Sequence, residues 1–147
     1  MAFLRYLTHP QIRLDAKVPV PLWGLSEVGR ARVEAFKISA LLADTRSIIS
    51  SLETKALETA AILADHWKLP MRVHAEAHEN DRTATGFLPP LEFEKAADLF
   101  FAHPNESMRG WEKARDAQHR IVAVTQQTLA ENVGGDILMV GHGGVGT

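Results

Sequence analysis

The chain has 147 residues, of which 46% are hydrophobic and 23% are charged, and its formal net charge is −2. These values predict one globular domain over residues 1–147 and exclude a general electrostatic surface for nucleic acid or an anionic membrane. The lack of cysteine excludes a disulfide framework and thiolate chemistry, and no apolar run approaches the length of a membrane span. We expect a cytoplasmic protein that binds neither nucleic acid nor membrane.

The first third of the chain predicts a strand, a loop, a helix and a second strand. Residues 2–8 are apolar and aromatic and predict the first strand, and the proline-rich residues 10–24 predict a loop. Ser26 has the position of a helix N-cap, so we expect a helix over residues 26–42. Residues 45–50 predict the second strand.

The middle of the chain predicts a helix, a strand, a long loop and another helix. Apolar residues recur at helical spacing within residues 50–67, and Pro70 ends that pattern. Residues 71–74 predict a third strand. Residues 75–92 are polar and then rich in glycine and proline, which predicts a long functional loop. A further helix is expected over about residues 92–102.

The last third predicts a long helix and a buried strand. A stripe formed by Met108, Trp111, Ile121, Val124 and Leu129 predicts a helix from about residues 105–107 to 132. Gly134 and Gly135 interrupt it, and residues 136–140 predict a buried strand. Because strands alternate with helices, we expect an α/β fold, a three-layer α/β/α sandwich with a mostly parallel central sheet.

Ligands of such sheets bind beyond the carboxyl ends of the strands. Three stretches directly follow or end a predicted strand: Thr8-His9-Pro10, Ser50-Ser51 and Gly141-His142-Gly143-Gly144. The glycine-rich stretch exposes main-chain N–H groups to an anion such as phosphate, and His142 has the position to donate to it. The alternative is a tight turn whose histidine only fills space.

The other candidates also have two interpretations. Ser50 and Ser51 precede a helix that carries Lys55, a combination that suits either an anion site or an ordinary N-cap. Glu79 in the long loop is either a general acid or a solvated carboxylate. His74 and His78 fall in a strand-then-loop region where they need not share a face, so no metal site is expected.

Taken in order, these stretches resemble the histidine phosphatase superfamily, the phosphoglycerate-mutase-like proteins. Thr8-His9-Pro10 lies where that family has a strand followed by Arg-His-Gly, and Leu25-Ser26-Glu27-Val28-Gly29 resembles its Leu-Ser/Thr-x-x-Gly helix start. Residues 50–60 resemble Ser-Ser/Asp-Pro-Leu-x-Arg-Ala-x-x-Thr-Ala. Gly141-His142-Gly143-Gly144 matches the family's last motif without change.

The resemblance implies a phosphatase that uses no metal and no cofactor and acts on a small phosphomonoester. Its catalytic residues are then His9, which becomes phosphorylated, His142 and the proton donor Glu79. Phosphate-binding residues are expected among the following: Thr8, Ser50, Lys55, Gly143, Arg13 and Arg82. The resemblance also implies a further helix and strand after Gly144, so we expect the C-terminal part of the fold to be missing from this chain.

Three departures from the family pattern leave the function open. Thr8 and Lys55 replace arginines, which removes bidentate phosphate clamps, and Arg5, Arg13 or Arg82 are candidates to supply the lost charge. Pro10 replaces glycine but keeps a carbonyl that can orient the His9 ring.

The main hypothesis is a phosphatase that forms a phosphohistidine. The alternative is a catalytically impaired module that binds phosphate esters. An acyl-transfer hydrolase that uses Ser50 or Ser51 is a weaker hypothesis, because the chain lacks a Gly-x-Ser-x-Gly motif.

Overall fold

The computed structural model describes residues 2–132 and 134–147 and has an all-parallel central sheet. Its four strands are β1 (Leu4–Thr8), β2 (Thr45–Ser51), β3 (Met71–His74) and β4 (Asp136–Gly141), in the order β1-β4-β2-β3. The last strand of the chain therefore lies between the first two. Because β4 is covered on both faces, all of its residues are buried.

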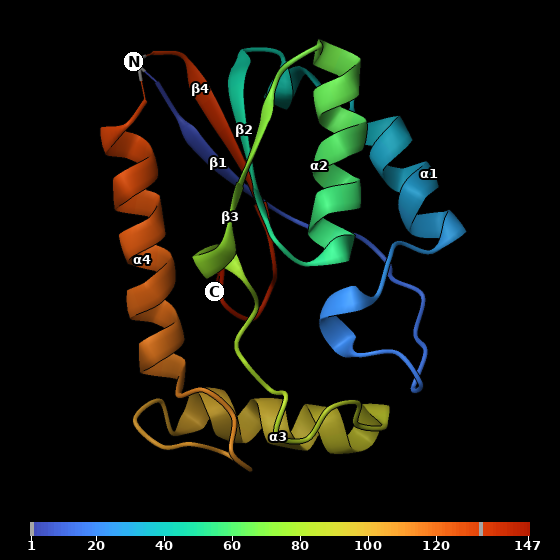
Figure 1. Ribbon diagram of the computed structural model, residues 1–147, viewed down its shortest axis with the longest axis vertical. Coiled ribbons are helices and arrows are strands. Elements are labelled where there is room, and N and C mark those ends of the chain that lie inside the picture. Colours follow the sequence, from blue (N-terminus) through green and yellow to red (C-terminus); the bar gives the residue numbers. More distant parts are fainter. Residues whose placement is uncertain (1, 133) are drawn as a thin grey trace.

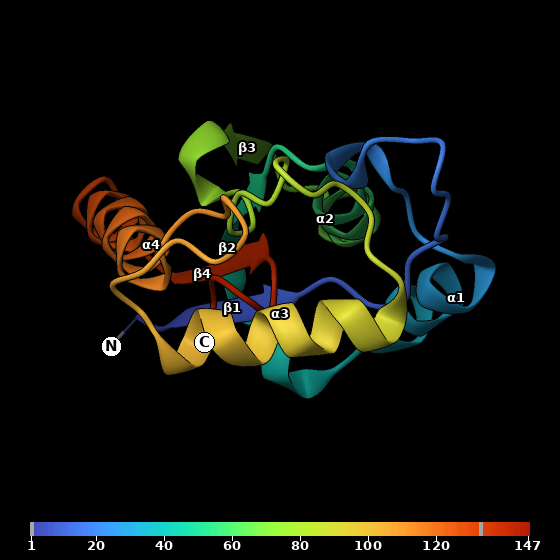
Figure 2. The same ribbon diagram turned by 90° about the horizontal axis from the view of Figure 1, so that it is seen from below.

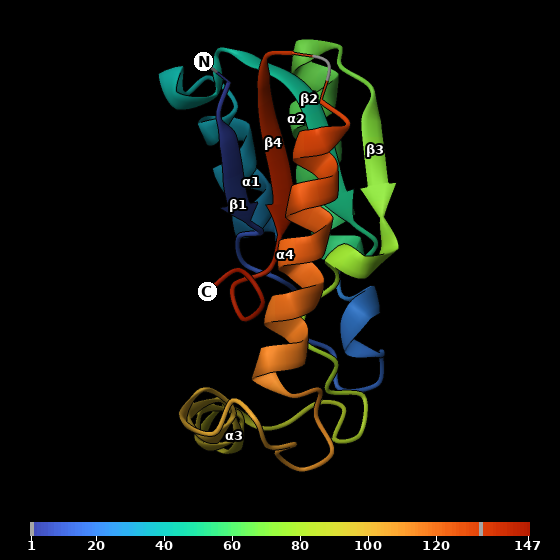
Figure 3. The ribbon, with the colours of Figure 1, turned by 90° about the vertical axis from the view of Figure 1, so that its left-hand side faces the viewer.

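Helices cover both faces of the sheet, which confirms the three-layer α/β/α prediction (Figures 1 and 3). One face carries α1 (Glu27–Phe36) and α2 (Thr54–Trp67), and α4 (Ala114–Ala130) covers the other. The helix α3 (Pro90–Ala102) lies across the end of the sheet to which the strands point (Figure 2). Short 3₁₀ segments complete the fold: η1 (Val20–Leu22), η2 (Ala40–Leu42) and η3 (Ala75–Ala77).

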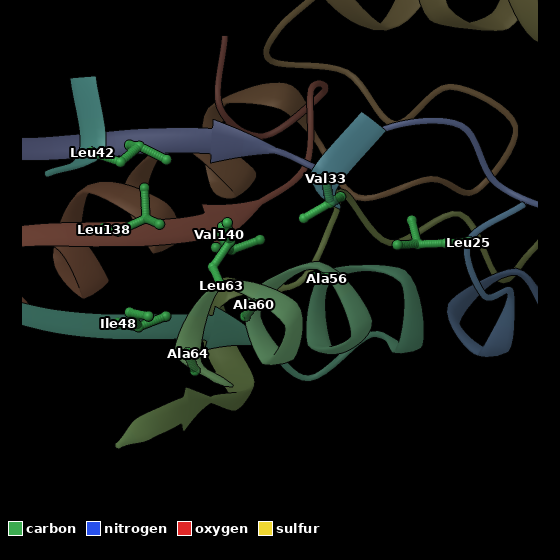
Figure 4. Packing of buried hydrophobic residues seen from close by; sticks show 10 residues of the cluster. All are labelled: Leu25, Val33, Leu42, Ile48, Ala56, Ala60, Leu63, Ala64, Leu138 and Val140. Atoms are coloured by element: carbon green, nitrogen blue, oxygen red, sulfur yellow. The ribbon is translucent and has the colours of Figure 1, made fainter. Parts of the chain in front are cut away.

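Each face of the sheet has its own hydrophobic core. Ile48, Leu138 and Val140 of the sheet pack against Ala60 and Leu63 of α2 (Figure 4). A second cluster joins Met139 to α3, α4 and the side chain of Trp111. The small alanines of α2 let that helix approach the strands closely, which holds its N-terminus against the carboxyl ends of β2 and β4.

The first predicted helix is six residues too long. It ends at Phe36, and residues 40–42 form the separate segment η2. Ser39 has an extended backbone (ψ 132°), and its hydroxyl accepts from the Leu41 N–H at 3.3 Å. A serine that caps a new turn competes with the continuing helix, and here the local bond replaces the helical one.

The start of the last helix was also predicted wrongly, because α4 begins at Ala114. Arg109 and Gly110 both have left-handed backbones, with φ of 54° and 82°, so no helix can run through them. Trp111 lies in an irregular segment, its side chain is buried, and its indole donates to the Thr85 hydroxyl at 2.9 Å. Its apolar side chain therefore belongs to the hydrophobic core although the residue is not part of a helix.

Gly29 disfavours a helix by its intrinsic propensity, but the packing of α1 requires a glycine at this position. A Cβ at this position would lie 2.0 Å from the carbonyl oxygen of Gln11, so only glycine lets α1 meet the loop at residues 10–24. The predicted cap is confirmed, since the Ser26 hydroxyl accepts from the Gly29 N–H at 3.0 Å. Glu58 of α2 accepts from the Leu25 N–H at 2.8 Å and fixes the same turn.

Candidate active site

The parallel register brings the three predicted stretches to one edge of the sheet. Thr8 pairs with Gly141, and Ser50 pairs with Val140 on the other side of β4. The His9 N–H donates to the Gly141 carbonyl at 3.1 Å, which extends the ladder into the site. As a result, the rings of His9 and His142 meet edge to face, with their centroids 5.3 Å apart.

His9 has the tautomer that a nucleophile needs. Its Nδ1 lies 2.9 Å from the carbonyl oxygen of Pro10, an atom that can only accept, so Nδ1 carries the proton. The unprotonated nitrogen is then Nε2. Burial lowers the pKa of His9 below its usual 6.5, which keeps the ring neutral at pH 7. The predicted role of the Pro10 carbonyl is confirmed.

His142 is completely buried and held from two sides. The ring Nε2 of His142 lies 2.7 Å from the Ser51 hydroxyl, and the main-chain N–H of His142 donates to the Tyr6 hydroxyl at 2.9 Å. Burial lowers the pKa of His142 from 6.5 to about 3, so the ring is neutral at pH 7. Its Nδ1 has no partner within the part of the chain that the structure describes, which leaves one nitrogen of a neutral ring for a ligand.

Tyr6 is the hydroxyl that fixes the main chain of His142. It accepts from the His142 N–H and lies 3.2 Å from the His142 carbonyl oxygen, to which it donates. Burial raises the pKa of Tyr6 to about 12, so the hydroxyl keeps its proton throughout the neutral range. Tyr6 therefore sets the position of His142 relative to β1.

Lys55 forms a buried ion pair at the start of α2. Its Nζ lies 2.5 Å from Oε2 of Glu53, and the exposed fractions of the two side chains are 2% and 9%. The same Nζ donates to the Val20 carbonyl of η1 at 2.9 Å. An ammonium has three N–H donors, and the acceptors among residues 2–132 and 134–147 engage two of them.

Glu53 connects the other parts of the site. Its Oε1 accepts from the Glu79 N–H at 3.0 Å and lies 3.9 Å from Nε2 of His142. Burial acts to raise the pKa of Glu53, but the positive charges and donors around the carboxylate outweigh burial, so this pKa lies below its usual value. In the motif of residues 50–60, Glu53 lies where the family pattern has a leucine.

The Glu79 carboxylate holds the glycine-rich turn. It accepts from the main-chain N–H groups of Gly144 at 3.0 Å and Val145 at 2.7 Å, and from that of Asn80 at 3.0 Å. A Cβ at Gly144 would lie 2.6 Å from Oε1 of Glu79, which explains the last glycine of the motif. Glu79 thus lies at the predicted site, while its role as proton donor stays a prediction.

Arg120 of α4 anchors the segment that carries Glu79. Its guanidinium donates to the carbonyls of Glu76 at 2.6 Å and His78 at 2.9 Å. It also pairs with Glu112 through two bonds of 3.0 and 2.8 Å. This bidentate geometry fixes the guanidinium and with it the main chain on both sides of His78.

The remaining predicted phosphate ligands are less closely tied to the histidine pair. Thr8 and Gly143 lie at the edge of the site and are exposed. Arg82 is half-buried, with its guanidinium 4.7 Å from the centre of the Phe93 ring. Arg13 is exposed on the loop at residues 10–24.

Two other predicted groups are used elsewhere. The Ser50 hydroxyl donates to the Ser51 carbonyl at 2.9 Å, so its proton is taken and its role in phosphate binding stays a prediction. Arg5 pairs with Asp136 at the start of β4, which removes it as a substitute for the missing arginine.

Sequence reasoning missed three residues of the site. They are Tyr6, Glu53 and Arg120. Ser51 was a candidate together with Ser50, and its place at the end of a strand was a signal that the two serines shared. Among residues 2–132 and 134–147, no group of three or more His, Cys, Asp or Glu side chains could hold a metal ion. In that same part of the chain, no helix is both long and apolar enough to span a membrane.

Two neutral histidines, a buried lysine and a glycine-rich turn lie together at the carboxyl edge of a parallel sheet, the edge at which ligands of α/β proteins bind. Residues 13–147 match the model of the histidine phosphatase superfamily (branch 1), and the chain belongs to this superfamily. The match begins after His9, so the family model does not test the likeness of Thr8-His9-Pro10 to the first motif, and that likeness stays a prediction. No curated protein matches the chain.

Several solved structures share the fold. A mycobacterial glucosyl-3-phosphoglycerate phosphatase has a TM-score of 0.80 and 22% identity, over 95% of this chain and 73% of that one. YhfR from Bacillus stearothermophilus has a TM-score of 0.75 and 21% identity, over 97% and 74% of the two chains. An alpha-ribazole phosphatase from Shigella flexneri has a TM-score of 0.70 and 14% identity, over 97% and 74%.

Proposed function

We propose that the protein hydrolyses a small phosphomonoester through a phosphohistidine at His9. The observation that carries this proposal is the bond from His9 Nδ1 to the Pro10 carbonyl, which leaves Nε2 unprotonated at the carboxyl edge of the sheet. Membership of the histidine phosphatase superfamily supports the reaction class. The reaction needs only residues of this chain and water.

In the first step, the lone pair of His9 Nε2 forms the N–P bond while the bond from phosphorus to the ester oxygen breaks. Glu79, in its protonated form, gives the leaving oxygen its proton. The free N–H of Lys55 and a ring N–H of His142 stabilise the charge on the equatorial oxygens. In the second step, water attacks phosphorus, Glu79 takes its proton, and the N–P bond breaks to restore His9.

A second function has its own support. The charge of Lys55 is paired with Glu53, and both oxygens of Glu79 already accept main-chain N–H groups. A site with its charges engaged in this way favours binding of a phosphate ester without turnover. Thr8 in place of arginine points in the same direction, because threonine cannot form a bidentate clamp.

Released phosphate distinguishes the two functions. We expect the protein to release phosphate from at least one ester of a panel of small phosphomonoesters, and we expect His9→Ala to abolish this release. A phosphoryl group should be found on the peptide that contains His9 after rapid quenching. His66→Ala, an exposed histidine of α2, is the control and should keep full activity. Phosphate release that is unchanged in His9→Ala would refute the phosphohistidine route, and ester binding without release would favour the second function.

A further inference from the structure

A cavity of about 610 Å³ opens beside the proposed reaction centre. It shares Glu53 and Glu79 with that centre, and the rest of its wall comes from the loop at residues 10–24, from Leu52 and from the segment after β3. These loops lie beyond the carboxyl ends of the strands (Figures 1 and 3). The volume suits one small ligand. A phosphate at His9 would therefore have its ester group next to this cavity.

One wall of the cavity is apolar although it is open to solvent. Leu22 and Leu52 line it with exposed fractions of 61% and 58%, and Pro19, Val20 and Pro21 continue the same surface. Leu52 is the residue between Ser51, which contacts His142, and Glu53, which pairs with Lys55. Exposed leucines at such a position do not stabilise the core and are suited to contact a ligand.

The apolar wall is rigid before any ligand binds. The prolines at positions 19 and 21 restrict the backbone of η1, and Lys55 fixes the Val20 carbonyl at 2.9 Å. The indole of Trp23 is buried and donates to the carbonyls of Asp15 at 2.8 Å and Val18 at 2.9 Å. A preformed wall saves the entropy of ordering a loop and increases discrimination among ligands.

The charged part of the lining is unfavourable for a second anionic group. Of the four charged residues that line the cavity, Glu53, Glu79 and Asp81 are acidic and only Arg82 is basic. Lys55 offsets Glu53, and Asp81 offsets Arg82 when Glu79 holds the proton that the proposed reaction needs, so the lining has no surplus positive charge. A leaving group with its own carboxylate or second phosphate would find no counter-charge here.

From this wall and this charge distribution, we infer that the preferred substrate is a phosphomonoester whose leaving alcohol is bulky, apolar and free of negative charge. The inference rests on the proposed function and gives its substrate class. Polyhydroxylated sugars lose their hydration against Leu22 and Leu52 without gaining hydrogen bonds there, and phosphorylated acids find no unpaired positive charge in the lining.

Three primary alkyl phosphates test this preference, since they differ in the leaving group but not in its attachment. We expect kcat/KM for 2-phenylethyl phosphate to exceed the values for glucose 6-phosphate and 3-phosphoglycerate by at least about tenfold. Leu22→Ser and Leu52→Ser should each lower kcat/KM for 2-phenylethyl phosphate about tenfold and change that for glucose 6-phosphate little. Leu41→Ser, which changes an equally exposed leucine of η2 (67%), is the matched control and should change neither value.

The results separate this inference from the function on which it rests. Equal kcat/KM for the three esters, or a preference that both serine variants retain, would overturn the inference and leave phosphoryl transfer intact. If no ester is hydrolysed, the proposed function fails, and calorimetry with 2-phenylethylphosphonate and methylphosphonate then tests the cavity directly. Tighter binding of the phenylethyl compound that is lost in Leu22→Ser would support the inference, and equal binding would overturn it.

Discussion

Loss of one partner from the buried ion pair of Lys55 and Glu53 should strongly lower the free energy of unfolding. Lys55→Met removes the ammonium and leaves the carboxylate of Glu53 at 9% exposure without its counter-ion. Loss of one partner from a buried pair costs about 3–5 kcal/mol, because the remaining charge is not solvated. The bond to the Val20 carbonyl is lost as well, so we expect the free energy of unfolding to fall by about 4 kcal/mol.

The double variant Glu53→Leu/Lys55→Met tests whether the cost comes from the unpaired charge. Replacement of a whole buried ion pair by apolar residues of similar volume is often nearly neutral. The double variant should therefore be more stable than Lys55→Met, by about 2–3 kcal/mol. A double variant less stable than the single one would refute this reasoning.

An exposed pair in the same chain serves as the control. Lys37 and Glu34 are also 2.5 Å apart, but their side chains are 31% and 49% exposed. Lys37→Met should cost at most about 1 kcal/mol, because water screens such a pair. Urea unfolding followed by tryptophan fluorescence measures all of these variants. A loss below about 1 kcal/mol in Lys55→Met would show that water reaches the pair.

Three further predictions concern the surroundings of the histidine pair. The pKa of His142 is lowered from 6.5 to about 3, so the folded state binds fewer protons than the unfolded state between these values. In urea titrations, the free energy of unfolding should be level above pH 6.5 and should fall by about 2 kcal/mol as the pH is lowered to 5. The fall with pH should be smaller in His142→Asn, and an equal fall in both proteins would contradict this prediction. Arg120→Met should cost about 3 kcal/mol and speed amide hydrogen exchange in the segment that carries Glu79, and unchanged exchange would exclude its positioning role. Gly144→Ala should lower the free energy of unfolding by about 1–3 kcal/mol in the same titrations, because its Cβ would lie 2.6 Å from Oε1 of Glu79. Gly143→Ala is the control, since nothing lies within 4 Å of a Cβ at that position, and equal losses in the two variants would count against the contact.

The succession of strands and helices along the chain and the three layers were predictable because they depend on local patterns. The apolar run at residues 136–140 predicts a buried strand, and the alanine stripe within residues 54–67 predicts a helix. The structure has both elements, as β4 and α2. The helix ends were less predictable. A single serine hydroxyl at Ser39 and two left-handed residues at positions 109 and 110 decide them, and such local competition is not visible in hydrophobic spacing.

The candidate site was predictable only in outline. Parallel strands guarantee that residues after their carboxyl ends meet, which is why His9 and His142 could be placed together. The partner of a charged group depends on tertiary packing, so neither the Lys55–Glu53 pair nor the Arg120 anchor had a sequence signal. At the end of a strand that is covered on both faces, sequence cannot tell which of two serines contacts His142.

The position of β4 in the centre of the sheet has a consequence for folding. Tyr6 and His142 contact each other across 136 positions of the chain, and Ser51 reaches His142 across 91. The strands β1 and β2 share no neighbour until residues 136–141 insert between them. Pairings between such distant segments require loop closure before they contribute stability, so they form late and slowly. The two histidines should accordingly come together in one of the last folding events, when the central strand joins the sheet.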